Sequence, residues 1–217
     1  MKQPVLSLRI TEIFHSLQGE STTIGLPTVF VRLTGCPLRC HYCDTTYAFT
    51  GGNRLAFDHI MTEVASYACQ YVCVTGGEPL AQPNCTVLLQ NLCDEGYSVS
   101  LETSGALSLE GVDERVMVVM DLKTPDSGEH QKNKLSNLSL LKKNDQLKFV
   151  LCGREDYQWA RDMLITHQLQ DKAMILFSPS YGQLNPTELA NWIVQDRLPV
   201  RFQVQLHKLL WNDAPGH

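Results

Sequence analysis

The stretch that decides the fold is Thr28-Val-Phe-Val-Arg-Leu-Thr-Gly-Cys-Pro-Leu-Arg-Cys-His-Tyr-Cys43. Its first half is rich in β-branched and apolar residues, as a core strand is. Its second half places Cys36, Cys40 and Cys43 at C-x3-C-x2-C spacing. Three thiolates at this spacing can hold three irons of a [4Fe–4S] cluster, because Cys thiolate is the usual ligand of such clusters. The fourth iron would then lack a protein ligand and could bind a small molecule.

A structural zinc site is the alternative interpretation of these cysteines. Closed zinc sites take four ligands, often from paired Cys motifs. His41 is the only nearby candidate for a fourth ligand, but it follows Cys40 directly and cannot easily point at the same ion. No second C-x2-C follows downstream. The spacing, together with the motifs described below, favours the cluster.

Length and composition limit the possible classes of protein. The 217 residues, 43% of them hydrophobic, suit a single α/β domain over residues 1–217. A net charge of −5 without a long basic run argues against a nucleic-acid partner. The N-terminus lacks the apolar stretch of a signal peptide, and no segment approaches the length of a membrane span. Eight cysteines without an export signal indicate reduced thiols in the cytoplasm.

Apolar, β-branched runs alternate with helical patterns along the chain. Strands are expected at 6–13, 28–34, 71–75, 98–102, 116–121, 147–151, 174–177 and 202–206. Helices are expected at 58–69 with Asp58 as N-cap, at 84–95 closed by Gly96, at 155–167, and at 186–196 opened by Asn185-Pro186. Alternating strands and helices predict a parallel sheet, whose first core strand is 28–34. Six or seven strands are too few for a complete eight-stranded barrel. The polar segment 123–145 is the best candidate for a mobile loop.

Polar residues follow three of the expected strands. Thr75-Gly-Gly-Glu-Pro79, Glu102-Thr-Ser-Gly105 and Asp121-Leu-Lys-Thr-Pro125 would share one rim of the sheet, where α/β barrels carry their active sites. The two glycines allow the backbone to approach a ligand closely. Ordinary loop capping by Ser, Thr and Asp is the alternative.

The cysteine triplet, with Tyr42 before its third member, and the Gly-Gly-Glu-Pro turn resemble the radical S-adenosylmethionine (SAM) superfamily. The resemblance implies a partial (β/α) TIM-type barrel of about six parallel strands. It also implies that SAM binds the open iron and that one electron from the reduced cluster breaks its C–S bond. The resulting 5′-deoxyadenosyl radical would take a hydrogen atom from the substrate. The implied contacts to cofactor are Tyr42, Cys43, Asp44, Gly77, Glu78, Ser104, Asp121, Leu122 and Lys123.

Four further motifs narrow the resemblance. They are Leu17-Gln-Gly-Glu20, the strand with Arg32, Cys43-Asp-Thr45 and Gln205-Leu-His-Lys208, and together they resemble the 7-carboxy-7-deazaguanine synthases over nearly the whole chain. That family usually has Gly-Glu-Gly where this chain has Gly19-Glu20-Ser21. The resemblance implies that 6-carboxy-5,6,7,8-tetrahydropterin is converted, with ring contraction and loss of ammonia, to 7-carboxy-7-deazaguanine, a precursor of queuosine. SAM would be regenerated, and Mg²⁺ would assist.

The residue types fit this chemistry. Arg32 offers a forked donor for the substrate carboxylate. Thr45, supported by Asp44, is a candidate Mg²⁺ ligand because hard cations prefer oxygen. Glu102 and His207 are the candidates for moving a proton during loss of ammonia, with His207 and Gln205 expected on the last strand. The remaining expected substrate contacts are Leu17, Gln18, Gly19 and Thr75.

Partners and one rival function follow from the same resemblance. A flavodoxin or ferredoxin would supply the electron, and the family is usually homodimeric. A radical SAM activase, which installs a glycyl radical on a partner protein, shares the cysteine triplet and the glycine turn. Such an enzyme needs a groove for a protein chain, whereas Arg32 suits a closed pocket for a carboxylate. A zinc-binding module without enzymatic activity is the third possibility.

Overall fold

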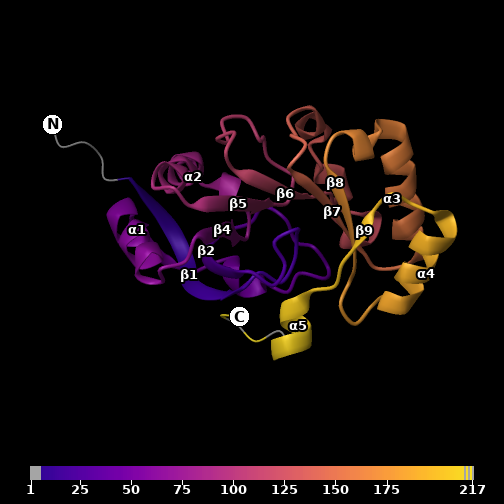
Figure 1. Cartoon of the computed structure of the whole chain (residues 1–217), viewed down its shortest axis with the longest axis horizontal. Coiled ribbons are helices and arrows are strands. Elements are labelled where there is room, and N and C mark those ends of the chain that lie inside the picture. Colours follow the sequence, from indigo (N-terminus) through magenta and orange to yellow (C-terminus); the bar gives the residue numbers. More distant parts are fainter. Residues whose placement is uncertain (1–5, 213, 215, 217) are drawn as a thin grey trace.

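Nine strands form one sheet in the computed structural model, which describes residues 6–212, 214 and 216 (Figure 1). Their order across the sheet is β3-β1-β2-β4-β5-β6-β7-β8-β9. From β2 to β9 every neighbouring pair is parallel, while β1 pairs antiparallel with both β2 and β3. The bounds are β1 Ser7–Leu17, β2 Pro27–Leu33, β3 Asn53–Ala56, β4 Tyr71–Gly76, β5 Ser98–Thr103, β6 Met117–Asp121, β7 Gln146–Leu151, β8 Met174–Pro179 and β9 Arg201–Phe202. The predicted partial barrel of parallel strands is therefore confirmed.

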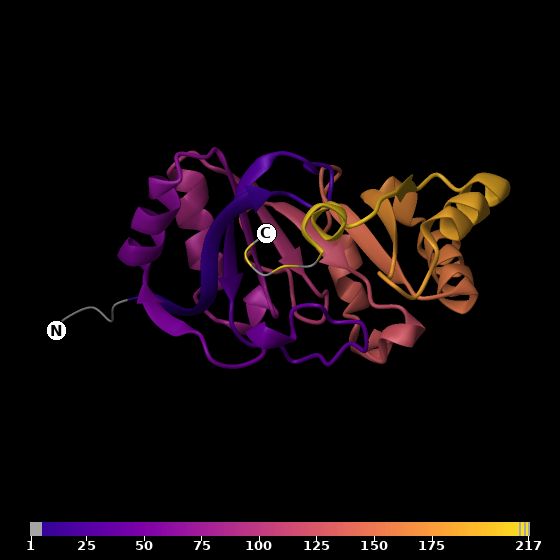
Figure 2. The same cartoon turned by 90° about the horizontal axis from the view of Figure 1, so that it is seen from below.

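Four helices cover the outer face of the sheet, two over each half (Figures 1 and 2). The helices α1 (Phe57–Ser66) and α2 (Cys85–Asp94) pack on the strands of the first half through a cluster that includes Ile60, Leu88 and Leu101. The helices α3 (Arg154–His167) and α4 (Pro186–Asp196) cover the second half through a cluster that includes Phe149, Tyr157 and Phe177. Apolar side chains on this face leave the other face for polar groups.

The helix predictions hold closely, with one exception in capping. The helix α4 begins at Pro186, and the side chain of Asn185 accepts a hydrogen bond from the backbone N–H of Thr187 (2.9 Å), as an N-cap does. Asp58 was predicted as the N-cap of α1, but the helix begins at Phe57 and Ala56 is its N-cap. Asp58 lies in the first turn instead, where a carboxylate interacts favourably with the helix dipole.

Two strand predictions are wrong in extent. The strand β1 continues to Leu17, past the predicted end at residue 13, because its second half pairs with β2 as far as Leu17 opposite Pro27. The predicted strand 202–206 ends at Phe202. A short helix, α5 (Leu206–Trp211), follows, so His207 lies on a helix rather than on a strand.

The segment 123–145 is not an open loop. It contains three of the short 3₁₀ helices, and it packs on the barrel through the buried side chains of Asn137 and Leu138. Asn137 Nδ2 donates to the carbonyl oxygen of Leu107 (2.7 Å). The 3₁₀ helices of the chain are η1 Thr46–Ala48, η2 Pro79–Ala81, η3 Pro125–Ser127, η4 His130–Lys132, η5 Leu135–Ser139 and η6 Leu169–Asp171. Within the described residues, no helix has the length and apolar character needed to cross a bilayer.

Candidate active site

A cavity of about 310 Å³ opens at the carboxyl ends of the parallel strands. Its wall combines those strand ends with the cysteine loop, the turn after β1 and the helix α5. Segments from Phe14 to Gly216, at opposite ends of the sequence, therefore meet at one site, as expected for a barrel. The predicted site residues that line it are Leu17, Gln18, Gly19, Arg32, Cys36, Cys40, Tyr42, Cys43, Asp44, Thr45, Thr75, Gly77, Glu102, Ser104, Asp121, Lys123 and His207.

The glycine turn after β4 lies directly against the cysteine loop. Glu78 N donates to the carbonyl oxygen of Gly35 (2.8 Å), and a Cβ atom at Gly77 would collide with that oxygen. Gly76 has a positive φ (143°), which favours glycine. The glycines therefore allow close packing between the turn and the residue preceding Cys36. The sequence predicts that these glycines let the backbone approach a ligand, whereas the structure shows them packed against the protein's own cysteine loop.

Two predicted cofactor contacts do not line the cavity. Glu78 is fully buried, and its carboxylate accepts hydrogen bonds from Thr103 Oγ1 (2.9 Å), from Ser104 N (2.7 Å) and from Leu80 N (3.0 Å). It thus ties the turn after β4 to the end of β5, where Thr103 and Ser104 line the cavity and Glu78 does not. Leu122 is also buried, in the hydrophobic cluster beneath α3.

Glu102 lies at the centre of a small polar group on the cavity wall. Its two carboxylate oxygens accept from Gln18 Nε2 (3.2 Å) and from Thr75 Oγ1 (2.9 Å). Since Gln18 follows β1 and Thr75 lies near the end of β4, the carboxylate fixes the position of the loop after β1 relative to the barrel. Three predicted residues therefore form one connected unit.

Arg32 points its guanidinium into the cavity between two aromatic rings. Its Nε donates to Glu12 Oε1 (2.7 Å), and its central carbon lies 5.6 Å from the ring of Phe14 and 5.8 Å from that of Tyr47. Burial would lower the pKa of Arg32, but the facing Tyr47 and Glu12 outweigh it and the pKa is raised. A permanently charged, aromatic-flanked guanidinium is suited to binding a carboxylate.

The helix α5 contributes His207 and Lys208 to the cavity lining, and Figure 2 shows it lying across the face of the sheet opposite the covering helices. Lys208 Nζ lies 2.8 Å from Asp44 Oδ2, and Gln205 Nε2 donates to the same oxygen (3.3 Å). Burial alone would raise the pKa of Asp44, but Lys208 holds it well below its usual range. Thr45 Oγ1 donates to the other oxygen of Asp44 (2.9 Å). The ring of His207 packs so tightly on Gly19 that a Cβ atom there would collide with it.

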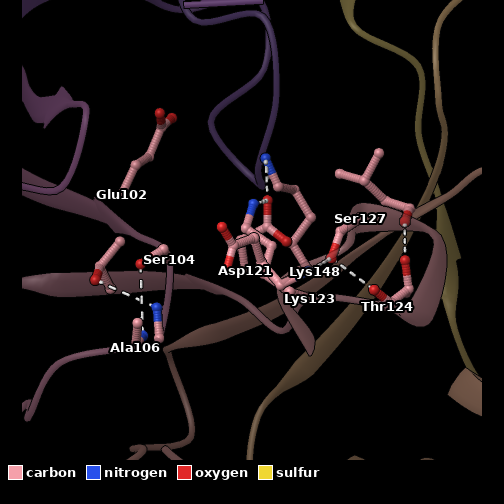
Figure 3. A network of polar contacts seen from close by, with 12 residues as sticks. Glu102, Ser104, Ala106, Asp121, Lys123, Thr124, Ser127 and Lys148 are labelled. Atoms are coloured by element: carbon pink, nitrogen blue, oxygen red, sulfur yellow. Dashed lines mark hydrogen bonds and ion pairs between the residues drawn. The ribbon is translucent and has the colours of Figure 1, made fainter. Parts of the chain in front are cut away.

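Four largely buried charges line the cavity wall: Glu20 on the loop after β1, Asp121 and Lys123 at the end of β6, and Lys148 in β7. Figure 3 shows the last three of them. Asp121 Oδ2 lies 3.0 Å from Lys123 Nζ and 3.5 Å from Lys148 Nζ, and Lys148 Nζ lies 2.6 Å from Glu20 Oε2. Burial would raise the pKa of Asp121, but the two ammonium groups lower it. The same carboxylate raises the pKa of Lys123 against the effect of burial. Asp121 and Lys123 are therefore both charged at neutral pH.

Ser21 occupies the left-handed region of backbone space (φ 69°). This conformation explains why the resembling family usually has glycine at this position. The serine side chain fits because its hydroxyl shares a hydrogen bond with Thr23 Oγ1 (2.8 Å), while its N–H donates to Gln203 Oε1 (3.0 Å). With serine at this position, Glu20 lines the cavity.

The donor set at the cysteine loop fits an iron–sulfur cluster. Cys36, Cys40 and Cys43 are partly buried and all border the cavity. Burial raises the pKa of the Cys40 thiol to about 11 and also raises those of Cys36 and Cys43, so cluster assembly must displace their protons. In the described residues, no group of three or more His, Cys, Asp or Glu side chains is placed to hold a single metal ion. A cluster does not require such convergence, because each of its thiolates binds a different iron.

Several residues of the site had not been predicted. Lys148 and Glu12 stand out, since each forms an ion pair with a residue that lines the cavity. A lysine within the apolar run Leu147–Leu151 was a usable signal, because alternate residues of a strand face opposite sides. Glu12 could not be predicted, because its partnership with Arg32 depends on the register of β1 against β2. The aromatic lining by Phe14, Phe30, Tyr47 and Phe49 was also missed.

Comparison with known proteins identifies the family. The Radical SAM superfamily matches residues 30–132, which include the cysteine loop and the glycine turn. The 7-carboxy-7-deazaguanine synthase of Chlorobaculum tepidum is 46% identical over 96% of this chain and 97% of its own length. That of Koribacter versatilis is 41% identical over 94% of this chain and 97% of its own.

Solved structures bear out the fold. The crystal structure of QueE from Escherichia coli superimposes with a TM-score of 0.77 over 93% of this chain and 95% of that one, at 22% identity. Streptococcus suis SuiB bound to S-adenosylmethionine matches at a TM-score of 0.56, over 82% of this chain and 51% of SuiB, at 15% identity. High identity along almost the full length, together with the cysteine loop and its cavity, leads to one conclusion: the chain belongs to the 7-carboxy-7-deazaguanine synthase family of radical SAM enzymes.

Proposed function

We propose that the cavity is the active site in which this chain converts 6-carboxy-5,6,7,8-tetrahydropterin to 7-carboxy-7-deazaguanine with loss of ammonia. The product class serves the synthesis of queuosine and related 7-deazapurines. The observation that carries the proposal is that 17 of the predicted site residues, from all parts of the chain, line this one cavity. The relatives named above, which match almost end to end, support the reaction.

The cysteine loop and the neighbouring strand ends would hold the cofactors. Cys36, Cys40 and Cys43 would ligate the [4Fe–4S] cluster, and SAM would lie over the rim formed by Gly77, Ser104, Asp121 and Lys123. When bound, the cluster and SAM supply the radical that removes a hydrogen atom from the substrate. Thr45 offers a hydroxyl oxygen for Mg²⁺, beside the carboxylate of Asp44.

The opposite part of the wall would bind the substrate. Arg32 is fixed by Glu12 through Nε, so its outer nitrogens can receive the substrate carboxylate. Leu17, Gln18, Gly19 and Thr75 would contact the pterin ring, with Gln18 and Thr75 held in place by Glu102. Glu102 and His207 border the same space and are the groups we assign to proton movement when ammonia leaves.

The remaining assignments extend the proposal to the whole chain. Residues 1–217 would act as one domain, in a homodimer, and receive the electron from a flavodoxin or ferredoxin. Eight cysteines, all free in the structure, support a reducing compartment, the cytoplasm. The activase alternative is not favoured, because the curated relatives carry the synthase name. The zinc-module alternative does not account for a cavity that gathers so many predicted contacts.

Anaerobic reconstitution followed by mass spectrometry tests the reaction. Enzyme with SAM, a chemical reductant and Mg²⁺ should convert the carboxytetrahydropterin to 7-carboxy-7-deazaguanine. Cys40→Ala should abolish cleavage of SAM, whereas Arg32→Ala should mainly reduce turnover of the pterin by weakening its binding. Unchanged pterin after incubation with the wild-type enzyme would contradict the assignment, and undiminished SAM cleavage by Cys40→Ala would contradict the cluster.

A further inference from the structure

Lys148 is a largely buried cation in the cavity wall to which no motif assigns a role. It lies in β7, where Leu147 and Phe149 face the hydrophobic cluster beneath α3 and Lys148 faces the cavity. Its side chain exposes 12% of its surface. A lysine this deep is stable as a cation only beside carboxylates.

The ammonium of Lys148 joins carboxylates from two different parts of the wall. Nζ lies 2.6 Å from Glu20 Oε2, on the loop after β1, and 3.5 Å from Asp121 Oδ2, at the end of β6. Figure 3 shows Lys148 and Lys123 converging on Asp121. Burial would lower the pKa of Lys148, but Glu20, Asp121 and Glu102 raise it. The charge of Lys148 also helps to lower the pKa of Asp44.

Each of the two carboxylates keeps one oxygen without a donor. Glu20 Oε1 and Asp121 Oδ1 are buried and have no hydrogen-bond partner among the described residues. A buried acceptor without a donor is costly, so a ligand that supplies an N–H or O–H group would be favoured there. Both residues border the cavity, Glu20 beside the proposed substrate contacts and Asp121 at the proposed SAM rim.

We propose that Lys148 is a positioning residue that serves both ligands, because it holds Glu20 toward the pterin and Asp121 toward SAM with one oxygen of each left to accept. The inference rests on the proposed function for the identity of the two ligands. It deepens that function by naming a single residue that links the substrate part of the wall to the cofactor part. Lys148 itself need not touch either ligand.

Equilibrium binding without turnover tests the linkage. SAM and the carboxytetrahydropterin are titrated separately, under anaerobic conditions, into cluster-loaded but unreduced enzyme. Lys148→Met should weaken each ligand about tenfold or more, since each loses a charge-assisted hydrogen bond of fixed geometry. Lys148→Arg keeps the charge and should recover part of both affinities.

A matched control separates positioning from general loss of stability. Lys142 forms a similar pair with the buried Asp145 (3.2 Å) outside the cavity lining, so Lys142→Met also leaves a buried carboxylate without its cation. Both variants should lower the melting temperature, but Lys142→Met should leave both affinities unchanged. Amide hydrogen exchange provides a readout without ligands: the protected N–H groups of Ser21 and Thr22 should exchange faster in Lys148→Met and not in Lys142→Met.

Each outcome decides for or against the linkage. Weakening of both ligands supports it, while affinities within twofold of wild type, or weakening of one ligand alone, overturn it. If Lys148→Met does not fold, Lys148→Met/Glu20→Gln removes one charge of each sign and is compared with Glu20→Gln. A further loss of SAM affinity then supports the linkage, and an equal SAM affinity overturns it. Failure of the wild-type enzyme to bind the pterin would instead contradict the proposed function.

Discussion

At the scale of single residues, Ser21 shows how a side chain can occupy a position that favours glycine. Its φ of 69° is strained for a residue with a Cβ atom, and its hydroxyl pairs with Thr23. Ser21→Gly should change the free energy of unfolding by less than about 1 kcal/mol, because relief of strain offsets the lost hydrogen bond. Ser21→Val should lower it by about 2 kcal/mol or more, because a β-branched residue is poorly tolerated there. Urea unfolding of both variants measures this; equal stability of the two would contradict the strain.

The buried charges of the cavity wall should give a defined pH dependence. The lowered pKa of Asp121 means that its ion pairs contribute fully above about pH 4, the unfolded value, and are lost as pH falls from there through the lowered folded pKa. Asp121→Asn should therefore cost about 3 kcal/mol of stability at pH 7. The difference from wild type should shrink below about pH 4. Urea midpoints measured from pH 7 to pH 3 check this, and a difference independent of pH would exclude the ionised pair.

The positions of individual site residues were predictable where a motif fixes them, and less so where contacts with neighbouring strands decide. The cysteine spacing, Arg32 and Gln18 all led to the cavity. Glu78 is part of an equally clear motif, yet its carboxylate is taken up by Thr103 and Ser104 on the next strand. Such a contact depends on the register of β4 against β5, and the sequence around Glu78 carries no information about that register.

At the scale of elements, the turn after β4 and the cysteine loop depend on each other. A methyl group at position 77 would meet the carbonyl oxygen of Gly35, so Gly77→Ala must displace one of the two segments. We expect a loss of about 1–3 kcal/mol in unfolding free energy from overpacking, with reduced iron incorporation. Iron and sulfide analysis after anaerobic reconstitution, together with urea unfolding, measures both effects.

Gly153→Ala is the matched control for this substitution. Gly153 precedes α3, has extended backbone (φ −171°) and has no atom within 4 Å of the position of an added Cβ. Its replacement should change stability by about 1 kcal/mol at most and leave iron content unchanged. Wild-type iron content in Gly77→Ala would show that the cysteine loop tolerates a displaced turn.

The end of the chain shows where pattern alone misleads. Phe202-Gln-Val-Gln-Leu206 alternates apolar and polar residues, which is typical of a strand. The strand nevertheless stops at Phe202. Gln203 N donates to the carbonyl oxygen of Phe177, and Leu206 N donates to that of Gly19. These contacts, with β8 and with the loop after β1, direct the chain toward the cavity, where α5 begins at Leu206. Long helices such as α4, with Asn185-Pro186 at the start, were predictable because their signals are local.

At the scale of the whole molecule, one sheet connects two separate hydrophobic clusters. The first lies beneath α1 and α2 and the second beneath α3 and α4, while the cavity occupies the other face across both halves. Since residues of the two halves build one site, we expect the halves to unfold together. The alternation of strands and helices predicted this architecture. It did not predict whether the two hydrophobic clusters unfold together.

Substitution of a core leucine in the first half tests that coupling. Leu88 is fully buried in the first cluster, whereas the three tryptophans, Trp159, Trp192 and Trp211, all lie in the second half of the chain. Leu88→Ala should cost about 2–5 kcal/mol, from lost burial and the cavity left behind. If the chain is one cooperative domain, tryptophan fluorescence and far-ultraviolet circular dichroism should report the same lowered urea midpoint. The fluorescence midpoint could instead stay at the wild-type value while circular dichroism shows an earlier transition. The two halves would then unfold independently, and the cavity would be held together by its charges and helix α5 rather than by a common core.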